Sequence, residues 1–212
     1  MHDGHAAVMD GDWGAEPAPF GATWQKTMMW IYIVTDALLF SGLLVGYAFL
    51  RQSGTTPWPK QLEVFSIPFI AFMTFVLITS SMSMGAAVTA SKLGDRKKTQ
   101  LFLALTIVGG LIFLGCQAYE WSHFIHEGAR LTGAAAGSEL AHLGVPPAFP
   151  QTFFVLTGFH GSHVLSGLII LIITLVRWGM GKTPAQGVEM AGLYWHFVDL
   201  VWVFIFTLYY LL

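Results

Sequence analysis

The sequence predicts an all-α integral membrane protein, a bundle of five transmembrane helices with its amino terminus in the cytoplasm. The first observation is composition, because 55% of the 212 residues are hydrophobic and only 10% are charged, whereas soluble domains carry roughly 25% charged residues. The second is a set of apolar runs, each long enough to supply the ~20 helical residues that cross a bilayer core. Only helices and closed barrels satisfy every backbone hydrogen bond in lipid. The runs cover residues 28–50, 65–90, 101–119, 149–176 and 190–212.

The five spans differ in the charges that they contain. The first contains Asp36 and the fifth contains Asp199, whereas the spans between them contain no Asp, Glu, Lys or Arg. Ahead of the spans, residues 1–25 are polar and acidic and are expected to form a tail, which leaves residues 26–212 as one transmembrane domain. The connection 127–150 is rich in Gly, Ala and Pro, and we expect it to be an external loop.

The basic residues between the spans predict the direction of the bundle. Five crossings place most Lys and Arg on the face that carries the amino terminus, so the positive-inside rule puts that terminus in the cytoplasm. That face holds Lys26, Lys92, Arg96, Lys97, Lys98, Arg177 and Lys182, and the other holds Arg51, Lys60 and Arg130. In the turn "GDRKK", Arg96, Lys97 and Lys98 are candidates for anionic lipid headgroups, with a plain orientation signal as the alternative. Trp195, near one end of the fifth span, suits an interfacial aromatic belt in contact with lipid.

Charge and cysteine content exclude two classes of site. The net charge is −2, and Lys and Arg do not cluster on one face. The chain therefore offers no surface for binding nucleic acid. The single cysteine, Cys116, lies in an apolar run and can form neither an internal disulfide nor a paired-thiolate copper or zinc site. Membrane phospholipids are the expected surroundings of the chain.

Ionisable side chains inside the spans are the candidate functional residues. A carboxylate at the bilayer centre costs about 3 kcal/mol on insertion scales, so the aspartates of the first and fifth spans should face protein, water or a partner. In the fifth span Glu189, His196 and Asp199 fall on one flank of a helix. In the fourth span His160 and His163 share a flank with Gly and Ser residues, which let another helix come close. We predict that these five side chains form an intramembrane polar network.

Three interpretations of the histidines compete. Imidazoles on facing helices can hold haem or metal, and Glu120 with His123 forms a Glu-x-x-His of the kind used in di-iron bundles, although only one copy is present. A series of ionisable side chains can instead conduct protons. We predict the third interpretation, hydrogen bonds that join helices, with no metal and no catalytic residue in this chain. Asp36 is a separate case, since a lone buried acid near the inner face is a candidate for influencing proton uptake.

Five motifs resemble those of a known family. "FFVLTGFHGSHVLSG" (153–167), followed by "E-x4-YWHFVDLVWVF" (189–204), is similar to subunit III of the haem-copper terminal oxidases, the cytochrome c and quinol oxidase group. "GDRKK" with "CQAYEW" resembles the family's loop and third helix, and "IVTDALLF" resembles its segment with a buried acid. The resemblance covers nearly everything from about residue 28 to residue 212.

The resemblance implies a metal-free accessory subunit that stabilises catalytic subunit I and supports proton uptake during oxygen reduction. Haems and copper would belong to partner subunits, phospholipid would bind in a cleft, and the complex would lie in the bacterial inner membrane. Asp36 stands where the family usually has Glu, which makes it the proton-uptake candidate with a reach shorter by one methylene. The family's long form has seven helices, and the resemblance implies the shorter bacterial form without the first two.

Other complexes and one other class of protein remain alternatives. Cytochrome c oxidase is the expected complex, and the resemblance also fits subunit III of a quinol oxidase or the related helper of nitric oxide reductase. The rival from another class is a membrane redox protein that binds haem through His160, His163 and His196.

Overall fold

The computed structural model describes residues 23–54, 58–59, 64–142 and 144–211. Within them five helices are long and apolar enough to cross a membrane, which confirms the all-α class and the predicted spans. The helices are α1 (Trp24–Ser53), α3 (Ile67–Lys92), α4 (Arg96–His126), α6 (Ala148–Gly179) and α7 (Ala185–Ile205), the last continued by the π-helix η2 (Phe206–Leu211). The domain boundary at residue 25 and the cytoplasmic amino terminus stay predictions, because residues 1–22 lie outside the described part and the fold does not distinguish the two sides of a membrane.

The helices extend beyond the apolar runs that predict them. α4 covers Arg96–His126 although its apolar run covers only 101–119, because polar residues continue the helix past the hydrocarbon layer. Asp95 caps the start of α4, where a carboxylate oxygen accepts a hydrogen bond of 3.1 Å from the backbone N–H of Lys98. This bond, together with the Lys98 ammonium 3.2 Å away, holds the pKa of Asp95 below its ordinary value. An apolar run therefore reports the membrane-embedded length of a helix and not its full length.

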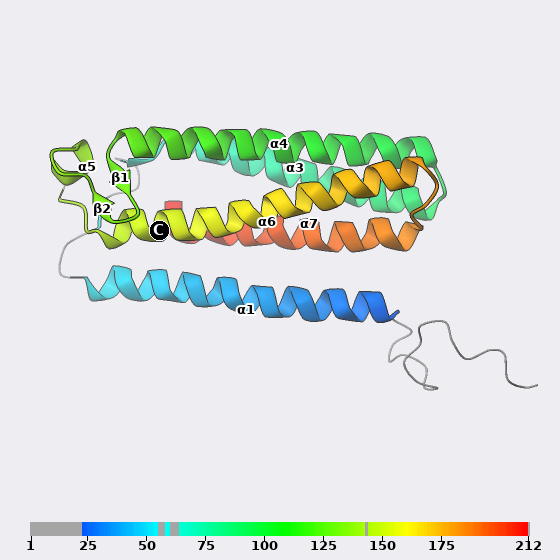
Figure 1. The fold of residues 1–212 in the computed structure, drawn as a ribbon, viewed down its shortest axis with the longest axis horizontal. Coiled ribbons are helices and arrows are strands. Elements are labelled where there is room, and N and C mark those ends of the chain that lie inside the picture. Colours follow the sequence, from blue (N-terminus) through cyan, green and yellow to red (C-terminus); the bar gives the residue numbers. More distant parts are fainter. Residues whose placement is uncertain (1–22, 55–57, 60–63, 143, 212) are drawn as a thin grey trace, which may run out of the picture.

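Short ordered elements lie within the connection 127–150. The strands β1 (Ala129–Arg130) and β2 (Gly133–Ala134) pair antiparallel, and the short helix α5 (Glu139–His142) follows them. Figure 1 places these elements together at one end of the bundle, whereas the α3–α4 and α6–α7 turns lie at the other end, beside the start of α1. Successive connections therefore alternate between the two ends of the bundle, as five membrane crossings require.

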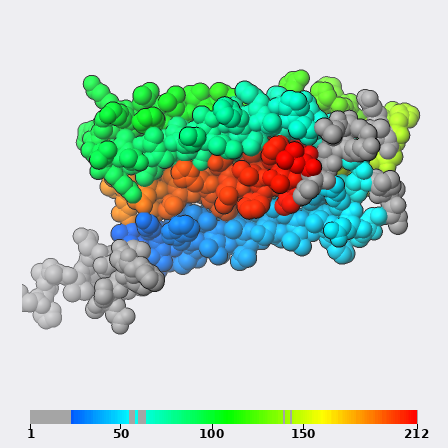
Figure 2. Space-filling view, turned by 180° about the vertical axis from the view of Figure 1, so that it is seen from behind, coloured from blue at the N-terminus to red at the C-terminus, as the bar shows by residue number. Residues whose placement is uncertain are grey.

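The long helices run side by side along the long axis of the molecule, and α7 is the central one (Figure 1). It packs against α1, α3 and α6. In Figure 2 the carboxyl-terminal segment lies between α1 on one side and α3 and α4 on the other. Half of the most apolar window of α7 is buried inside the chain (50%), compared with 22% for α1. α1 is therefore the outer helix, and most of its surface faces away from this chain.

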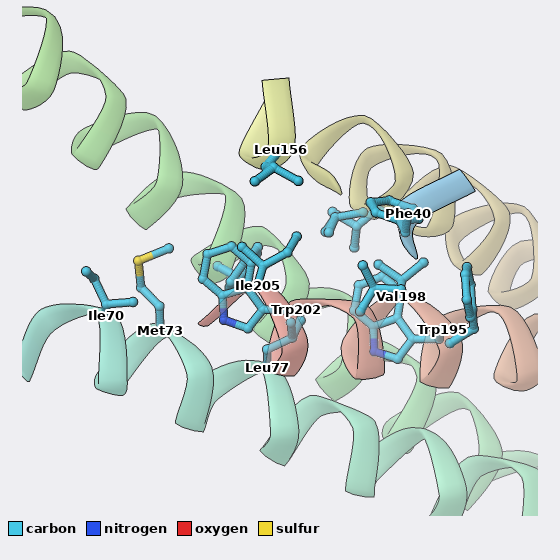
Figure 3. Packing of buried hydrophobic residues seen from close by; sticks show 14 of the residues in the cluster. Phe40, Ile70, Met73, Leu77, Leu156, Trp195, Val198, Trp202 and Ile205 are labelled. Carbon is cyan, nitrogen blue, oxygen red and sulfur yellow. The ribbon is translucent and has the colours of Figure 1, made fainter. Parts of the chain in front are cut away.

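Two tryptophans of α7 anchor the core (Figure 3). The indole N–H of Trp202 donates to the hydroxyl of Thr74 at 3.0 Å, and that of Trp195 donates to the hydroxyl of Ser80 at 3.1 Å. A buried indole requires such an acceptor. Gly110 of α4 makes room for the second ring, because a Cβ at this position would lie 2.6 Å from Trp195. Polar partners from α3 and a glycine from α4 thus fix the position of α7.

The predicted lipid contact of Trp195 is wrong. Its side chain is only 1% exposed and belongs to the core. Nearness to the end of an apolar run suggested an interfacial position. However, α7 begins at Ala185, and at 1.5 Å per residue Trp195 lies roughly 15 Å along the helix. That depth places the indole in the middle of the bundle, where only a partner such as Ser80 can satisfy it.

Candidate functional site

Asp36 and His163 form a buried polar contact between α1 and α6. The Oδ2 atom of Asp36 lies 3.4 Å from the Nε2 atom of His163, and the two side chains are 9% and 14% exposed. The Nδ1 atom of the imidazole lies 2.8 Å from the carbonyl oxygen of Phe159. A carbonyl can only accept, so Nδ1 carries a hydrogen. Because Oδ2 has no hydrogen bond in this arrangement, closing the contact requires one proton, carried either by the carboxyl group or by Nε2.

Aromatic rings flank this contact. The ring of Phe40 lies edge-on to the imidazole of His163 at 5.2 Å, and the ring of Phe159 lies at 4.6 Å. The hydroxyl of Tyr194 approaches the same turn of α6, 2.7 Å from the hydroxyl of Ser166. Charges interact more strongly in such surroundings than in water. The contact therefore joins α1 to α6 within a largely apolar layer.

The predicted network divides into separate groups, and His196 with Asp199 is one of them. The Nδ1 atom of His196 lies 2.6 Å from the hydroxyl of Ser81 on α3. The same serine also lies close to Asp199, one turn further along α7. Ser81 thus hydrogen-bonds to His196 and lies near Asp199, the two ionisable residues of α7 that the sequence placed on one flank. His196 itself is exposed on the surface of this chain.

Glu189 does not join that group. One of its carboxylate oxygens lies 2.8 Å from the ammonium of Lys26 on α1, and the other lies 3.3 Å from that of Lys92 on α3. Glu189 belongs to the second turn of α7, which begins at Ala185. It is therefore near the end of the bundle, where lysines that flank the other spans can reach it. Helical phase predicted which flank of α7 carries Glu189, but the depth of this residue in the membrane decided its partners, Lys26 and Lys92.

His160 is isolated from His163 although the two share a helix flank. Its side chain is 0% exposed, and neither ring nitrogen has a hydrogen-bond partner among the described residues. The imidazole lies 5.1 Å from the ring of Trp202 and 5.9 Å from that of Phe113. His160 thus packs in an aromatic box and makes none of the hydrogen bonds to other helices that were predicted for it.

The remaining candidates lie at the end of the bundle where α4 begins. Arg96, Lys97 and Lys98 are exposed in the first turn of α4, and their predicted contact with lipid headgroups stays a prediction. Within the described residues, no group of three His, Cys, Asp or Glu side chains is placed to hold a metal ion. Asp36 and His163 bring two ionisable side chains from different helices into contact, and proton binding is the chemistry that such a pair can support.

Several partners in these groups were not predicted from sequence. Lys26 and Lys92 were counted only as orientation signals, and Ser81 only as part of an apolar span. The same holds for Tyr210, whose hydroxyl donates to Glu120 at 3.1 Å. A serine or tyrosine inside an apolar run carries no sign of its partner, so only helix packing could reveal these contacts.

Comparison with known proteins identifies the family to which this bundle belongs. A family model described as cytochrome c oxidase subunit III matches residues 22–212. The chain belongs to the cytochrome c oxidase subunit III family. This confirms the resemblance drawn from the motifs, and it makes the protein an integral membrane subunit of a haem-copper oxidase.

The relatives compared are named as subunits of two kinds of oxidase, cytochrome c oxidase and quinol oxidase. The chain is 35% identical over 186 residues to the cytochrome c oxidase subunit 3 of Bacillus sp. (strain PS3), covering 86% of this chain and 83% of the relative. It is 32% identical over 190 residues to the probable quinol oxidase subunit 3 of Staphylococcus saprophyticus, covering 88% of each. It is 34% identical, with the same coverage, to the protein of that name in Staphylococcus aureus (strain USA300).

Proposed function

We propose that this chain is the metal-free, non-catalytic subunit III of a respiratory cytochrome c oxidase, and that it stabilises catalytic subunit I and supports proton uptake during oxygen reduction. The observation that carries the proposal is the Asp36–His163 contact, a buried acid and imidazole that need one proton to close a hydrogen bond between α1 and α6. A pair of this kind can take up and release a proton without any redox chemistry in its own chain.

The redox groups belong, in this proposal, to partner subunits. Family membership implies association with other oxidase subunits, and we assign the haems and copper to them, with subunit I among them. Support comes from the ligand sets of this chain. The only cysteine is Cys116, and the described residues bring together no three side chains of the types that bind metal. His160 would need ligands from another helix, and its ring is instead enclosed by Trp202 and Phe113.

Phospholipids and the membrane itself complete the proposed setting. Arg96, Lys97 and Lys98 are exposed together after the end of α3, which suits the phosphate groups of anionic lipids on the cytoplasmic side. The compared relatives come from bacteria, and we therefore place the complex in the bacterial inner membrane with the amino terminus in the cytoplasm.

The electron donor defines the main alternative. Two of the three relatives compared are named probable quinol oxidase subunits, so subunit III of a quinol oxidase is the second candidate. The donor site would lie in other subunits, and an assay of the purified complex with reduced cytochrome c and with a quinol decides between the two. The related helper of nitric oxide reductase is distinguished with the same preparation, because the purified complex would then reduce nitric oxide and not oxygen.

Two experiments test the proposal. Removal of this chain from the purified oxidase should leave the haem spectrum intact, and loss of that spectrum would refute the metal-free assignment. Asp36→Asn should lower sustained turnover and proton pumping in an assembled complex, Asp36→Glu should restore them, and Asp95→Asn in the surface turn should leave them unchanged. Wild-type activity of Asp36→Asn over many turnovers would remove Asp36 from proton uptake.

A further inference from the structure

A strip of α7 lies open at the surface between α1 and α3 (Figure 2). Leu200 and Phe204 on this helix are 55% and 52% exposed, and His196 is exposed one turn before Leu200. Apolar side chains on such a strip suit lipid. An imidazole does not, because ionisable side chains inside a membrane almost always face protein or a water-filled cavity.

His196 lies deep in the membrane. The apolar helix that carries it runs from Ala185 to Leu211, so at 1.5 Å per residue His196 lies roughly 16 Å from the start of this helix. A bilayer core is about 30 Å thick, which places the imidazole near the middle of the hydrocarbon layer. His196 therefore needs polar neighbours at a level where lipid supplies none.

This chain satisfies only one side of the imidazole. The Nδ1 atom of His196 lies 2.6 Å from the hydroxyl of Ser81 on α3, and no hydrogen bond from the described residues reaches Nε2. Asp199, which is half-buried, lies close to the same serine and adds a second polar group at this level. His160, in contrast, is fully enclosed by its own chain. The open imidazole indicates that another molecule completes its surroundings.

Beside His196, α3 offers small residues to a neighbouring helix. Ser81 and Gly85 are four residues apart and therefore lie on one side of α3. A Cβ added to Gly85 would have no atom within 4 Å, so no part of the described chain packs closely against this glycine. Gly110 differs, because it makes room for Trp195 of the same chain. Small residues at this spacing let the backbones of two transmembrane helices approach closely.

The surface residues of α3 and α7 that meet here, called the α3–α7 seam, are Ser81, Gly85, His196 and Leu200. We propose that the α3–α7 seam docks one transmembrane helix of a partner oxidase subunit, and that this helix carries a Ser, Thr, Asn or Gln side chain that hydrogen-bonds to Nε2 of His196. Such side chains join transmembrane helices. The inference rests on the proposed function, because membership of the family implies association with other oxidase subunits.

A partner subunit fits the α3–α7 seam better than the other two occupants that a membrane offers. An acyl chain carries no group that can bond to His196 at this depth. A second copy of this chain, docked with two-fold symmetry, would bring the same patch of both copies together. That arrangement places two Asp199 carboxyl groups near each other, whereas a different helix brings a complementary side chain.

The first experiment identifies the occupant in the whole oxidase. The photocrosslinking amino acid p-benzoylphenylalanine replaces Leu200, and the complex is illuminated in the membrane. We expect a crosslink to a transmembrane peptide of a different subunit, identified by mass spectrometry. A crosslink to a second copy of this chain, to lipid alone or to no protein would overturn the proposal. Failure of the chain to co-purify with haem-containing subunits would instead count against the proposed function.

A second experiment tests close packing at Gly85. Gly85→Leu fills the open space beside α3, and we expect the chain to be retained in the purified complex about tenfold less tightly as detergent is increased, because the partner helix is overpacked. Gly115→Leu is the matched control, since this exposed glycine of α4 also has no atom within 4 Å of an added Cβ. Its retention should be unchanged, and equal retention of the two variants would overturn the contact at Gly85.

A third experiment tests the hydrogen bond of His196. His196→Phe should weaken retention roughly threefold, the size typical of one hydrogen bond between transmembrane helices. His196→Gln returns a hydrogen-bonding group and should recover most of the loss, which a purely steric role of the ring does not predict. Wild-type retention of His196→Phe would overturn the polar contact. Where this variant fails to insert, the crosslink from position 200 decides the proposal, because it leaves His196 in place.

Discussion

The ammonium of Lys26 lies 2.8 Å from the carboxylate of Glu189, which ties the start of α1 to α7. Lys92 of α3 approaches the other oxygen at 3.3 Å, so one carboxylate joins three helices at the cytoplasmic end predicted for the bundle. The lysine side chains are 39% and 55% exposed, and that of Glu189 is 21% exposed. Because solvent screens such pairs, this cluster positions α1 and adds only modestly to the stability of the fold.

Replacement of Glu189 should therefore have a small effect that depends on salt. We expect Glu189→Gln to lower the free energy of unfolding in detergent by roughly 0.5–1 kcal/mol at low ionic strength, and by less in 1 M salt. Lys97→Gln, in the exposed first turn of α4, is the control and should change little. A loss that is equally large in high salt would show that Glu189 acts through packing and not through charge.

Asp36 and His163 should be energetically coupled. Residues in direct contact typically show interaction energies of about 0.5–3 kcal/mol in double-mutant cycles. We expect Asp36→Asn and His163→Phe to be non-additive in unfolding measurements, because each change removes the partner of the other. Asp36→Asn with His196→Phe is the matched control, since His196 contacts Ser81. Additivity of the first pair would mean that the 3.4 Å approach carries no interaction.

Two glycines of α4 should respond to alanine in opposite directions. A Cβ at Gly110 would lie 2.6 Å from Trp195 and 2.8 Å from Leu168, whereas nothing lies within 4 Å of one at Gly115. Gly110→Ala should destabilise the bundle by about 1–3 kcal/mol through overpacking. Gly115→Ala should be neutral or stabilise by up to about 1 kcal/mol, because alanine favours helix. Thermal unfolding in detergent measures both, and equal effects would contradict the close contact of α4 with α7.

The orientation predicted from basic residues can be tested with a membrane-impermeant maleimide on spheroplasts. Lys97→Cys and Arg130→Cys, each in a Cys116→Ser background, place one thiol in the first turn of α4 and one in the loop after α4, at positions that are exposed. We expect labelling at position 130 in intact spheroplasts, and at position 97 only after lysis. The reverse pattern would place the amino terminus outside.

The sequence by itself determined the class of this protein, its five spans and its family. Those properties depend on apolar length and on local motifs, and both can be read along one chain. The flank shared by His196 and Asp199 was also predictable, because helical phase is a local property.

Only the tertiary structure decided which polar groups meet. Helical phase placed Glu189 with His196, but lysines from α1 and α3 reach it because it lies at the membrane surface. Likewise His163 meets Asp36, whereas His160 on the same flank meets only aromatic rings. Trp195 lies in the core because Gly110 and Ser80 make a place for it, and neither residue signals that role in its own span. Partner choice depends on the depth and rotation of neighbouring helices, which are set by packing among residues far apart in the chain.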